Sequence, residues 1–185
     1  WDFENDKAGK DVWIYLRQEP AFPVLRSRSS RVDGPCAVVE QVWTHGRSTI
    51  RQTARLFSGA DRVEFETEVD WHEEAMMLRV QFPVAVQAGE ARFEIPFGSI
   101  LRSTREDTSE RRAQIEVAML QWLDLSQDDH GVAVLNDCKY GCRVKGHTID
   151  LTLIRSVPYT GGALIGKEDT ANTAVRGGYT DLGQH

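Results

Sequence analysis

The stretch DRVEFETEVDWHEEAMMLRVQFPVAVQ, residues 61–87, decides the fold. In its first half, apolar or neutral side chains alternate with charged ones: Val63, Phe65, Thr67, Val69 and Trp71 against Arg62, Glu64, Glu66, Glu68 and Asp70. A period of two indicates a β-strand with one buried and one solvated face, whereas a helix would scatter these apolar residues around its circumference. We therefore expect the four apolar members of this series to be buried and its three glutamates to be exposed.

The alternation resumes in the second half of the stretch. Apolar side chains at Leu78, Val80, Phe82, Val84 and Val86 again occupy every second position. The polar link 72–74 separates the two runs, and two strands with a short polar link are typical of an antiparallel hairpin. Pro83 lies on the outward phase, which indicates a sheet edge or a bulge. We expect this hairpin to form the centre of a β-sheet that the flanking strands extend.

Further short segments predict strands on both sides of the hairpin. They cover residues 12–16, 37–43, 48–57, 91–97, 115–119, 132–135 and 148–155, with a turn at Gly46. The continuous apolar run 132–135 predicts a fully buried strand, and the charged segment 98–112, which has no apolar stripe, predicts an exposed loop or arm. The pattern indicates an all-β protein, an antiparallel β-sandwich with few or no helices. We expect one domain over residues 1–185, with a flexible Gly- and Thr-rich loop at 159–180.

Charge and composition exclude several classes of function. A net charge of −6 disfavours non-specific nucleic-acid binding, and no apolar run is long enough to cross a membrane. The basic run 25–34 is typical of a solvated loop, with an anion or sugar contact as the alternative. The chain opens on Trp1 without an initiator Met, so we expect a piece excised from a longer protein, and the absence of a targeting signal says little about that parent. We expect the parent to be cytoplasmic.

The three cysteines do not form a disulfide framework. Cys36, Cys138 and Cys142 are odd in number, which suits a reducing compartment. A zinc site made of Cys138, Cys142 and His147 is a weak hypothesis, because structural zinc takes four ligands and a C-x-x-C pair is missing. We expect small buried or half-buried thiols and no metal or cofactor in this chain.

A dense polar cluster follows the run 132–135. It consists of Asn136, Asp137, Lys139 and Tyr140, with Gly141 permitting a turn. Amide, carboxylate, amine and phenol groups are those that hydrogen-bond sugar hydroxyls, but a polar turn that satisfies its own backbone is an equal alternative. A glycosidase needs two carboxylates on either side of a sugar, and nothing in the sequence pairs its acidic residues.

Several motifs follow one another from about residue 20 to the end. They are FPVLRSRSSRVDGP (22–35), GRSTI (46–50) with Gln52, VDWHE (69–73), FP (82–83), EARFEIPFG (90–98), DLS (124–126), GVAVLNDCKYG (131–141), LIRS (153–156) and D-x-G-x-H (181–185). In this order they resemble the β-sandwich region of glycoside hydrolase family 38, the α-mannosidases. The stretch 131–141 is the most specific of them.

The resemblance implies a function for the parent protein. Family members hydrolyse terminal α-mannosides with retention, through a covalent glycosyl-enzyme intermediate. It further implies that the nucleophilic Asp and the zinc ligands lie in an N-terminal barrel and the helical segment after it, so no catalytic residue is expected here. The chain would belong to a galactose-mutarotase-like supersandwich that packs on this barrel and helps wall the sugar site. The expected partners are the barrel and the mannoside, with no nucleic acid or membrane.

The resemblance also implies roles for named residues. Substrate contacts are expected from Asn136, Asp137, Lys139 and Tyr140. A second layer of residues that supports them is expected to consist of Arg155, Asp181 and His185. The chain departs from the family in having Leu120 where a His is expected before Gln121, and in a long loop from Tyr159 to Thr180. The alternatives are a free-standing carbohydrate-binding β-sandwich and a structural spacer. The first would need an exposed aromatic row, but Trp43, Trp71 and Trp122 lie within strands.

Overall fold

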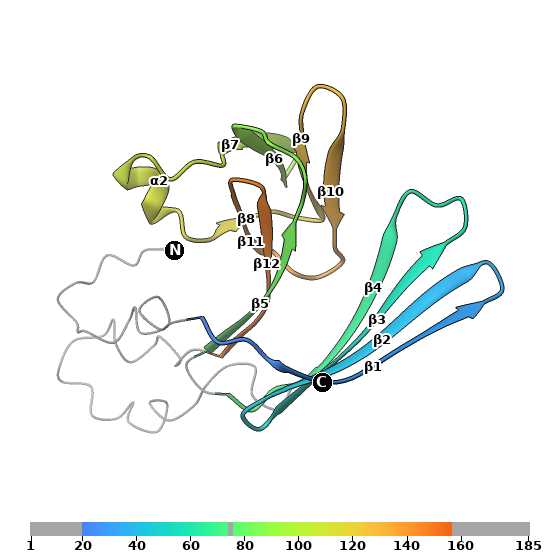
Figure 1. Ribbon diagram of the computed structural model, residues 1–185. Coiled ribbons are helices and arrows are strands. Elements are labelled where there is room, and N and C mark those ends of the chain that lie inside the picture. The colour runs from blue at the N-terminus through green and yellow to red at the C-terminus, as the bar shows by residue number, and fades with distance from the viewer. Residues whose placement is uncertain (1–19, 74–75, 157–185) are drawn as a thin grey trace, which may run out of the picture. The chain divides into compact units, whose positions relative to one another are not determined.

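The computed structural model describes residues 20–73 and 76–156, and these form an almost entirely β structure (Figure 1). The strands are β1 (Val24–Asp33), β2 (Cys36–His45), β3 (Ser48–Phe57), β4 (Val63–Asp70), β5 (Met76–Pro83), β6 (Glu90–Ile95), β7 (Gly98–Ser103), β8 (Val117–Ala118), β9 (Trp122–Ser126), β10 (Gly131–Leu135), β11 (Gly141–Lys145) and β12 (Thr148–Ser156), with a short helix α2 (Ser109–Ala113). In this part of the chain no helix has the length and apolarity to span a membrane. The all-β class is confirmed.

The strands pair into three four-stranded antiparallel sheets. The first sheet has the order β1-β2-β3-β4, the second β10-β9-β6-β7 and the third β5-β12-β11-β8. The chain divides into two compact units, residues 1–76 with 156–185 and residues 77–155. The expectation of a single domain stays a prediction, and the expected strand 12–16 and loop 159–180 lie outside the described residues.

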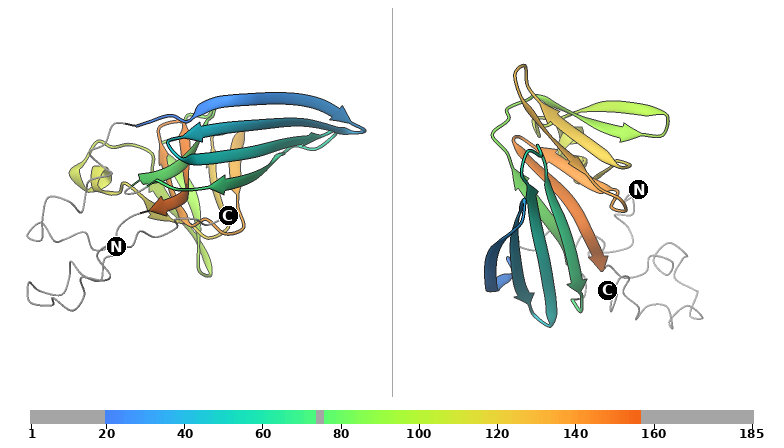
Figure 2. Two further views of the ribbon diagram at one scale, coloured as in Figure 1. Left: turned by 90° about the horizontal axis from the view of Figure 1, so that it is seen from below. Right: turned by 90° about the vertical axis from the view of Figure 1, so that its right-hand side faces the viewer.

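The first sheet is a meander in which each strand pairs with its neighbour in sequence, as both views of Figure 2 show. Tight turns at Gly34 and Gly46 join β1 to β2 and β2 to β3, and both glycines have positive φ angles, +56° and +51°. The expectation of a loop over residues 25–34 was wrong, because this segment is the edge strand β1. Its Arg and Ser side chains carry no apolar alternation, so pairing with β2 alone makes it a strand.

Strand β4 is present as expected, but its burial agrees with the prediction only in part: Glu66 and Glu68 are exposed, whereas Glu64 is half-buried. Val69 and Trp71 are buried, at 9% and 2% exposure. Val63 and Phe65 were expected to be buried as well, yet they are 48% and 49% exposed. The period of two correctly separates the faces of the strand. It does not show how much of the apolar face is covered.

The expected hairpin of β4 and β5 was wrong, although both strands exist. Strand β4 is an edge of the first sheet, whereas β5 is an edge of the third sheet and pairs with β12. The link after β4 is held by a distant residue, because Trp71 Nε1 donates a hydrogen bond to the buried Ser156 Oγ at 3.0 Å. Ser156, at the end of β12, also donates to the Met76 carbonyl at 3.0 Å. The edge position of Pro83 is confirmed.

Glu73 joins this link to the turn between β2 and β3. One carboxylate oxygen of Glu73 accepts hydrogen bonds from the backbone N–H of Arg47 at 2.7 Å and from Ser48 Oγ at 2.9 Å. A Cβ atom at Gly46 would lie 2.5 Å from the same oxygen, so a side chain there would displace the carboxylate. Although burial alone raises the pKa of Glu73, the hydrogen bonds from Arg47 and Ser48 outweigh it and lower that pKa.

The second and third sheets pack face to face around one hydrophobic core. Its buried members are Val86, Ala91, Phe93, Met119, Leu123, Leu125, Cys142, Val144, Ile149 and Leu151. Both sheets contribute the alternating side chains of one face each, which is the arrangement of a β-sandwich. The expected sandwich is therefore present within residues 77–155.

Residues 98–112 were expected to form an exposed loop, and this was wrong for two parts of the segment. Residues 98–103 form β7, which pairs with β6 through a two-residue turn at Pro96 and Phe97. Residues 109–113 form α2, and Thr108 caps it by accepting a hydrogen bond from the Arg111 N–H. Phe97 has a φ angle of +64° and its side chain lies fully in solvent. Neither β7 nor so short a helix buries an apolar stripe that the sequence could reveal.

Candidate functional site

The polar cluster lies on a segment that crosses from one sheet of the sandwich to the other. Residues 136–140 connect β10 in the second sheet to β11 in the third (Figure 1). A second crossing segment, residues 119–121, connects β8 in the third sheet to β9 in the second. The candidate site is therefore built on two crossing segments of the same sandwich.

Strand β10, which delivers the cluster, is not fully buried as expected. It is the edge strand of the second sheet, so β9 covers it on one side only. Val132 and Val134 are half-buried, whereas Ala133 is exposed and Leu135 is 77% exposed. The continuous apolar run is therefore an alternating strand whose outward positions are also apolar.

Backbone hydrogen bonds fasten the two crossing segments to each other. The N–H of Asn136 donates to the carbonyl of Gln121 at 2.8 Å, and the N–H of Met119 donates to the carbonyl of Tyr140 at 2.9 Å. Both ends of segment 136–140 are thus tied to segment 119–121. An ordinary surface loop has no such ladder, so the backbone of this segment is held in place.

Glu94 on β6 fixes the second crossing segment in turn. Its carbonyl accepts a hydrogen bond from the Leu120 N–H at 3.2 Å, and its carboxylate accepts one from the Gln121 N–H at 2.7 Å. The sequence analysis missed this residue, because Glu94 occupies an ordinary outward position in an alternating strand. Its partners follow 26 and 27 positions later, so no local pattern reveals the contact.

The side chain of Asn136 is used within its own turn. Its Oδ1 atom accepts hydrogen bonds from the N–H groups of Cys138, at 3.1 Å, and Lys139. Its Nδ2 group donates to the carbonyl of Leu120 at 3.3 Å. For Asn136, the arrangement therefore agrees with the alternative of a polar turn that satisfies its own backbone.

The other members of the cluster reach solvent. Asp137 is exposed, Lys139 is half-buried and Tyr140 is 54% exposed. Among the described ion pairs none joins Asp137 to Lys139, so their charges are not neutralised by each other. Hydrogen bonding to the Asp137 carboxylate, with desolvation added, raises the pKa of the exposed Cys138 thiol. The segment offers one carboxylate, one ammonium and one phenol on a braced backbone.

Arg155 lies in a different environment, on β12 in the third sheet. Its guanidinium is 3.6 Å from a Glu116 carboxylate oxygen, and the other oxygen of Glu116 is 3.7 Å from Arg79. Beside them Arg143 donates two hydrogen bonds to the buried Asp150 carboxylate, at 2.8 and 3.1 Å. Desolvation lowers the pKa of Arg79, and the carboxylate of Glu116 opposes that shift. Asp181 and His185 lie outside the described residues.

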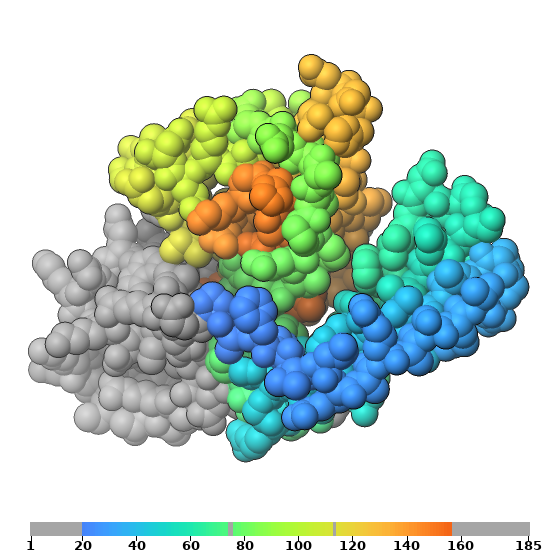
Figure 3. All heavy atoms as spheres, in the orientation of Figure 1, coloured from blue at the N-terminus to red at the C-terminus, as the bar shows by residue number. Residues whose placement is uncertain are grey.

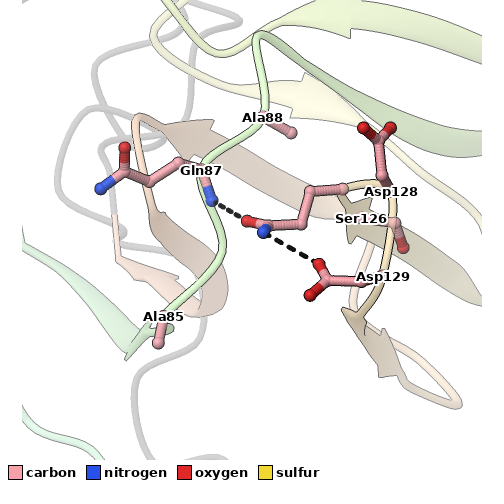
Figure 4. A pocket seen from close by; sticks show the side chains of 7 residues that line it. Ala85, Gln87, Ala88, Ser126, Asp128 and Asp129 are labelled. Atoms are coloured by element: carbon pink, nitrogen blue, oxygen red, sulfur yellow. Dashed lines mark hydrogen bonds between the residues drawn. The ribbon is translucent and has the colours of Figure 1, made fainter.

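An open hollow lies at the other end of β9 and β10, away from the polar cluster. It is lined by Ala85, Gln87, Ala88, Ser126, Gln127, Asp128 and Asp129 (Figure 4). Gln127 spans it by accepting a hydrogen bond from the Gln87 N–H at 2.9 Å and donating one to Asp129 at 3.1 Å. The Gln127 side chain therefore links this turn to the backbone of Gln87, which is the chemistry of a braced turn.

The cysteines do not gather into a metal site. Among the described residues, no group of three or more His, Cys, Asp or Glu side chains is placed to hold a metal ion. Cys142 is completely buried in the sandwich core, and desolvation raises the pKa of its thiol to about 12. Cys138, by contrast, is exposed on the crossing segment. Within residues 20–73 and 76–156, the hypothesised zinc site of Cys138, Cys142 and His147 is therefore not formed.

Comparison with known proteins places this sandwich in a family. Residues 1–160 match the sequence profile described as the glycosyl hydrolases family 38 C-terminal domain. The chain belongs to glycoside hydrolase family 38. The match includes both crossing segments and all three sheets, and it confirms the resemblance found in the motifs.

Three curated relatives of this family 38 domain carry the name alpha-mannosidase. Alpha-mannosidase 2C1 of Mus musculus is 42% identical over 109 residues, which cover 59% of this chain and 10% of the relative. Alpha-mannosidase G of Dictyostelium discoideum is 39% identical over 146 residues, covering 71% and 13%. The alpha-mannosidase of Saccharomyces cerevisiae is 35% identical over 109 residues, covering 58% and 10%. The chain thus spans about a tenth of the length of the relatives it matches.

Proposed function

We propose that this chain is a non-catalytic β-sandwich part of a retaining α-mannosidase that acts on terminal α-mannosides. In this proposal it packs on the catalytic barrel of the same polypeptide, which holds the zinc, and it helps to form the sugar site. Membership in family 38 and the names of the relatives support the reaction class. On its own the chain does not hydrolyse mannosides.

The observation that carries the proposed role in the sugar site is the braced crossing segment 136–140. The Asp137 carboxylate accepts hydrogen bonds and the Lys139 ammonium donates them, so together they match the hydroxyl groups of a sugar. Asn136 contributes indirectly, because its amide holds the backbone of Cys138 and Lys139. Groups held on a rigid backbone lose little entropy when they bind a ligand.

The same segment does not supply the chemical step. Retaining glycosidases use two carboxyl groups about 5–5.5 Å apart, one as nucleophile and one as acid and base. Segment 136–140 contains a single carboxylate, that of Asp137. Its contribution is therefore to bind and orient the sugar against catalytic groups supplied by the barrel. The aromatic row needed by a free-standing binding module is not found at Trp43, Trp71 and Trp122, which are half-buried or buried.

The test is made in the parent enzyme. Asp137→Ala should lower kcat/KM on an aryl α-mannoside at least about tenfold, which corresponds to about 1.4 kcal/mol of transition-state binding. Its thermal unfolding should stay close to that of the wild type, because Asp137 is exposed. Asp128→Ala is the matched control, since Asp128 is an exposed aspartate at the opposite end of β10.

Three outcomes would contradict the proposed contact. Full activity of Asp137→Ala would leave the segment with a structural role only. A loss of activity accompanied by an equal loss of folded protein would lead to the same conclusion. Equal losses in Asp137→Ala and Asp128→Ala would show that the effect is not specific to the crossing segment.

A further inference from the structure

The turn between β6 and β7 contains an aromatic residue with an unfavourable backbone conformation and a fully exposed side chain. The strand pairing closes with Ile95 opposite Gly98, so Pro96 and Phe97 are the two residues of the turn. Phe97 has a φ angle of +64°, in the left-handed region that glycine and asparagine normally occupy in such turns. Of the large apolar residues described, Phe97 is also the most exposed. In Figure 3 the part of the chain drawn in light green to yellow, which includes β7 and α2, lies at the surface.

The fold of the sandwich does not account for a phenylalanine at this position. A bulky side chain at a positive φ angle is destabilising relative to glycine, because its Cβ atom lies too close to the neighbouring carbonyl oxygen. The Phe97 ring recovers none of this cost by burial, since it is fully exposed. Strained positions of this kind cluster at functional sites. The strain together with the exposure therefore indicates a binding role for the ring.

The turn lies at the same end of the second sheet as the candidate site. Strand β6 pairs antiparallel with β9, and β9 pairs antiparallel with β10, so the end of β6, the start of β9 and the end of β10 are neighbours. The turn with Phe97 follows β6, segment 119–121 precedes β9 and segment 136–140 follows β10. The hydrogen bond from the Leu120 N–H to the Glu94 carbonyl, at 3.2 Å, joins the end of β6 to segment 119–121.

We propose that Phe97 is a sugar-binding residue, on whose ring the sugar that carries the terminal α-mannose stacks. The inference rests on the proposed function and extends it from the terminal mannose to the next sugar of the substrate. The C–H groups on one side of a pyranose ring form an apolar surface that matches the face of an aromatic ring. The hydroxyl groups of the substrate need polar partners, which Asp137 and Lys139 provide at the same end of the sandwich.

A sugar fits this end of the sandwich better than a protein surface does. Lysine and aspartate are depleted at the centre of protein interfaces, whereas Asp137 and Lys139 both belong to this end. The turn is also preorganised, because Pro96 has a fixed φ angle and the pairing of β6 with β7 holds both of its ends. A preorganised aromatic ring loses little conformational entropy when it binds a ligand.

The test compares two substrates in the parent enzyme. An α-linked mannobiose has a second sugar, whereas α-mannosyl fluoride has none. In Phe97→Ala the ratio of kcat/KM for mannobiose to kcat/KM for the fluoride should fall at least about fivefold, because only mannobiose uses the ring. Leu101→Ala is the matched control, since it removes another exposed apolar side chain from the same hairpin, and its ratio should equal that of the wild type.

Two further variants separate binding from folding. Phe97→Gly removes the ring but suits the positive φ angle, so the parent should unfold at the same temperature as the wild type or a higher one. The ratio for the two substrates should nevertheless fall as it does in Phe97→Ala. Phe97→Tyr retains a flat aromatic ring and should keep a ratio close to that of the wild type. A purely structural role of Phe97 would not produce this pattern.

An unchanged ratio in both Phe97→Ala and Phe97→Gly would overturn the inference, because the ring would then not contact the second sugar. Equal losses on both substrates together with a lower unfolding temperature would also overturn it, and would identify Phe97 as a contact within the protein. Asp137→Ala keeps these results distinct from the proposed function, since it should lower kcat/KM on both substrates. If it does so while the Phe97 variants keep the wild-type ratio, the sugar contact of segment 136–140 stands and only the stacking on Phe97 is excluded.

Discussion

The sandwich of the second and third sheets closes its own core, whereas the first sheet leaves much of its apolar face in solvent. Phe93, Leu123 and Ile149 from the two sandwich sheets are at most 2% exposed. Val63 and Phe65 occupy the same kind of alternating position in the first sheet and are about half exposed. Alternation therefore determines which side chains share a face, and the presence of a second layer determines whether that face becomes a core.

Replacing one leucine in each region compares how much a side chain contributes to the free energy of unfolding. Leu125→Ala removes a completely buried side chain from the sandwich core and should cost about 2–5 kcal/mol of unfolding free energy. Leu56→Ala removes a side chain that is 46% exposed on the first sheet and should cost less than about 1 kcal/mol in the 185-residue chain. Urea denaturation gives both values. Equal costs would mean that the first sheet has a core of its own.

Glycine-to-alanine substitutions compare the stability of the two turns at the ends of β2. Gly46→Ala introduces a Cβ atom 2.5 Å from the Glu73 carboxylate at a positive φ angle, and should cost about 1–3 kcal/mol. Gly34→Ala is the control, since Gly34 has a similar φ angle but no atom within 4 Å of the added Cβ atom. It should cost only about 1 kcal/mol. If both variants unfold at the same denaturant concentration, Glu73 does not brace the turn.

The two regions should respond to pH in opposite directions. The folded-state pKa of Glu73 is lowered, so its contribution to stability is present above the unfolded pKa of about 4.3 and disappears as the pH falls through the folded value. In the sandwich, hydrogen bonding to the Ala85 carbonyl and then to Asp129 raises the pKa of His130. Its contribution is complete below an unfolded pKa of about 6.5 and disappears as the pH rises through the folded value.

Substitution of each group should flatten only its own part of the pH profile. Glu73→Gln should reduce the loss of stability on acidification, and His130→Gln should reduce the loss above neutral pH. Chemical denaturation at a series of pH values measures both, and an NMR titration of the His130 ring gives its pKa. A pKa of His130 at or below 6.5 would contradict the assignment of its two acceptors.

The sequence was sufficient to predict which side chains share a face in most strands, and to predict the turn at Gly46. It was not sufficient for the partner of β5, because the residue that fixes the link, Ser156, follows it by the length of the whole sandwich. It also did not reveal β1, whose polar side chains show no alternation. Strand existence is a local property of the chain, whereas sheet membership depends on contacts that no window of sequence contains.

For the candidate site, the residues alone predicted the polar turn and left its purpose open. In the structure, the Asn136 side chain stabilises the turn itself. Asp137 and Lys139 project from a backbone that hydrogen bonds fasten to segment 119–121. The brace itself could not be predicted, because it needs Glu94 and segment 119–121 to meet the turn. The sugar contacts stay a prediction.

The pairing of β5 with β12 has a consequence for how the protein folds. The first sheet joins strands that follow one another in sequence, so each pairing closes only a short loop. Strand β12 reaches β5 only after residues 84–147 have been organised between them. Pairings between distant segments carry a larger loop-closure entropy and form more slowly. Until β12 pairs with it, β5 has two open edges instead of the one that it keeps in the folded sheet, and unpaired strand edges make folding chains prone to aggregation.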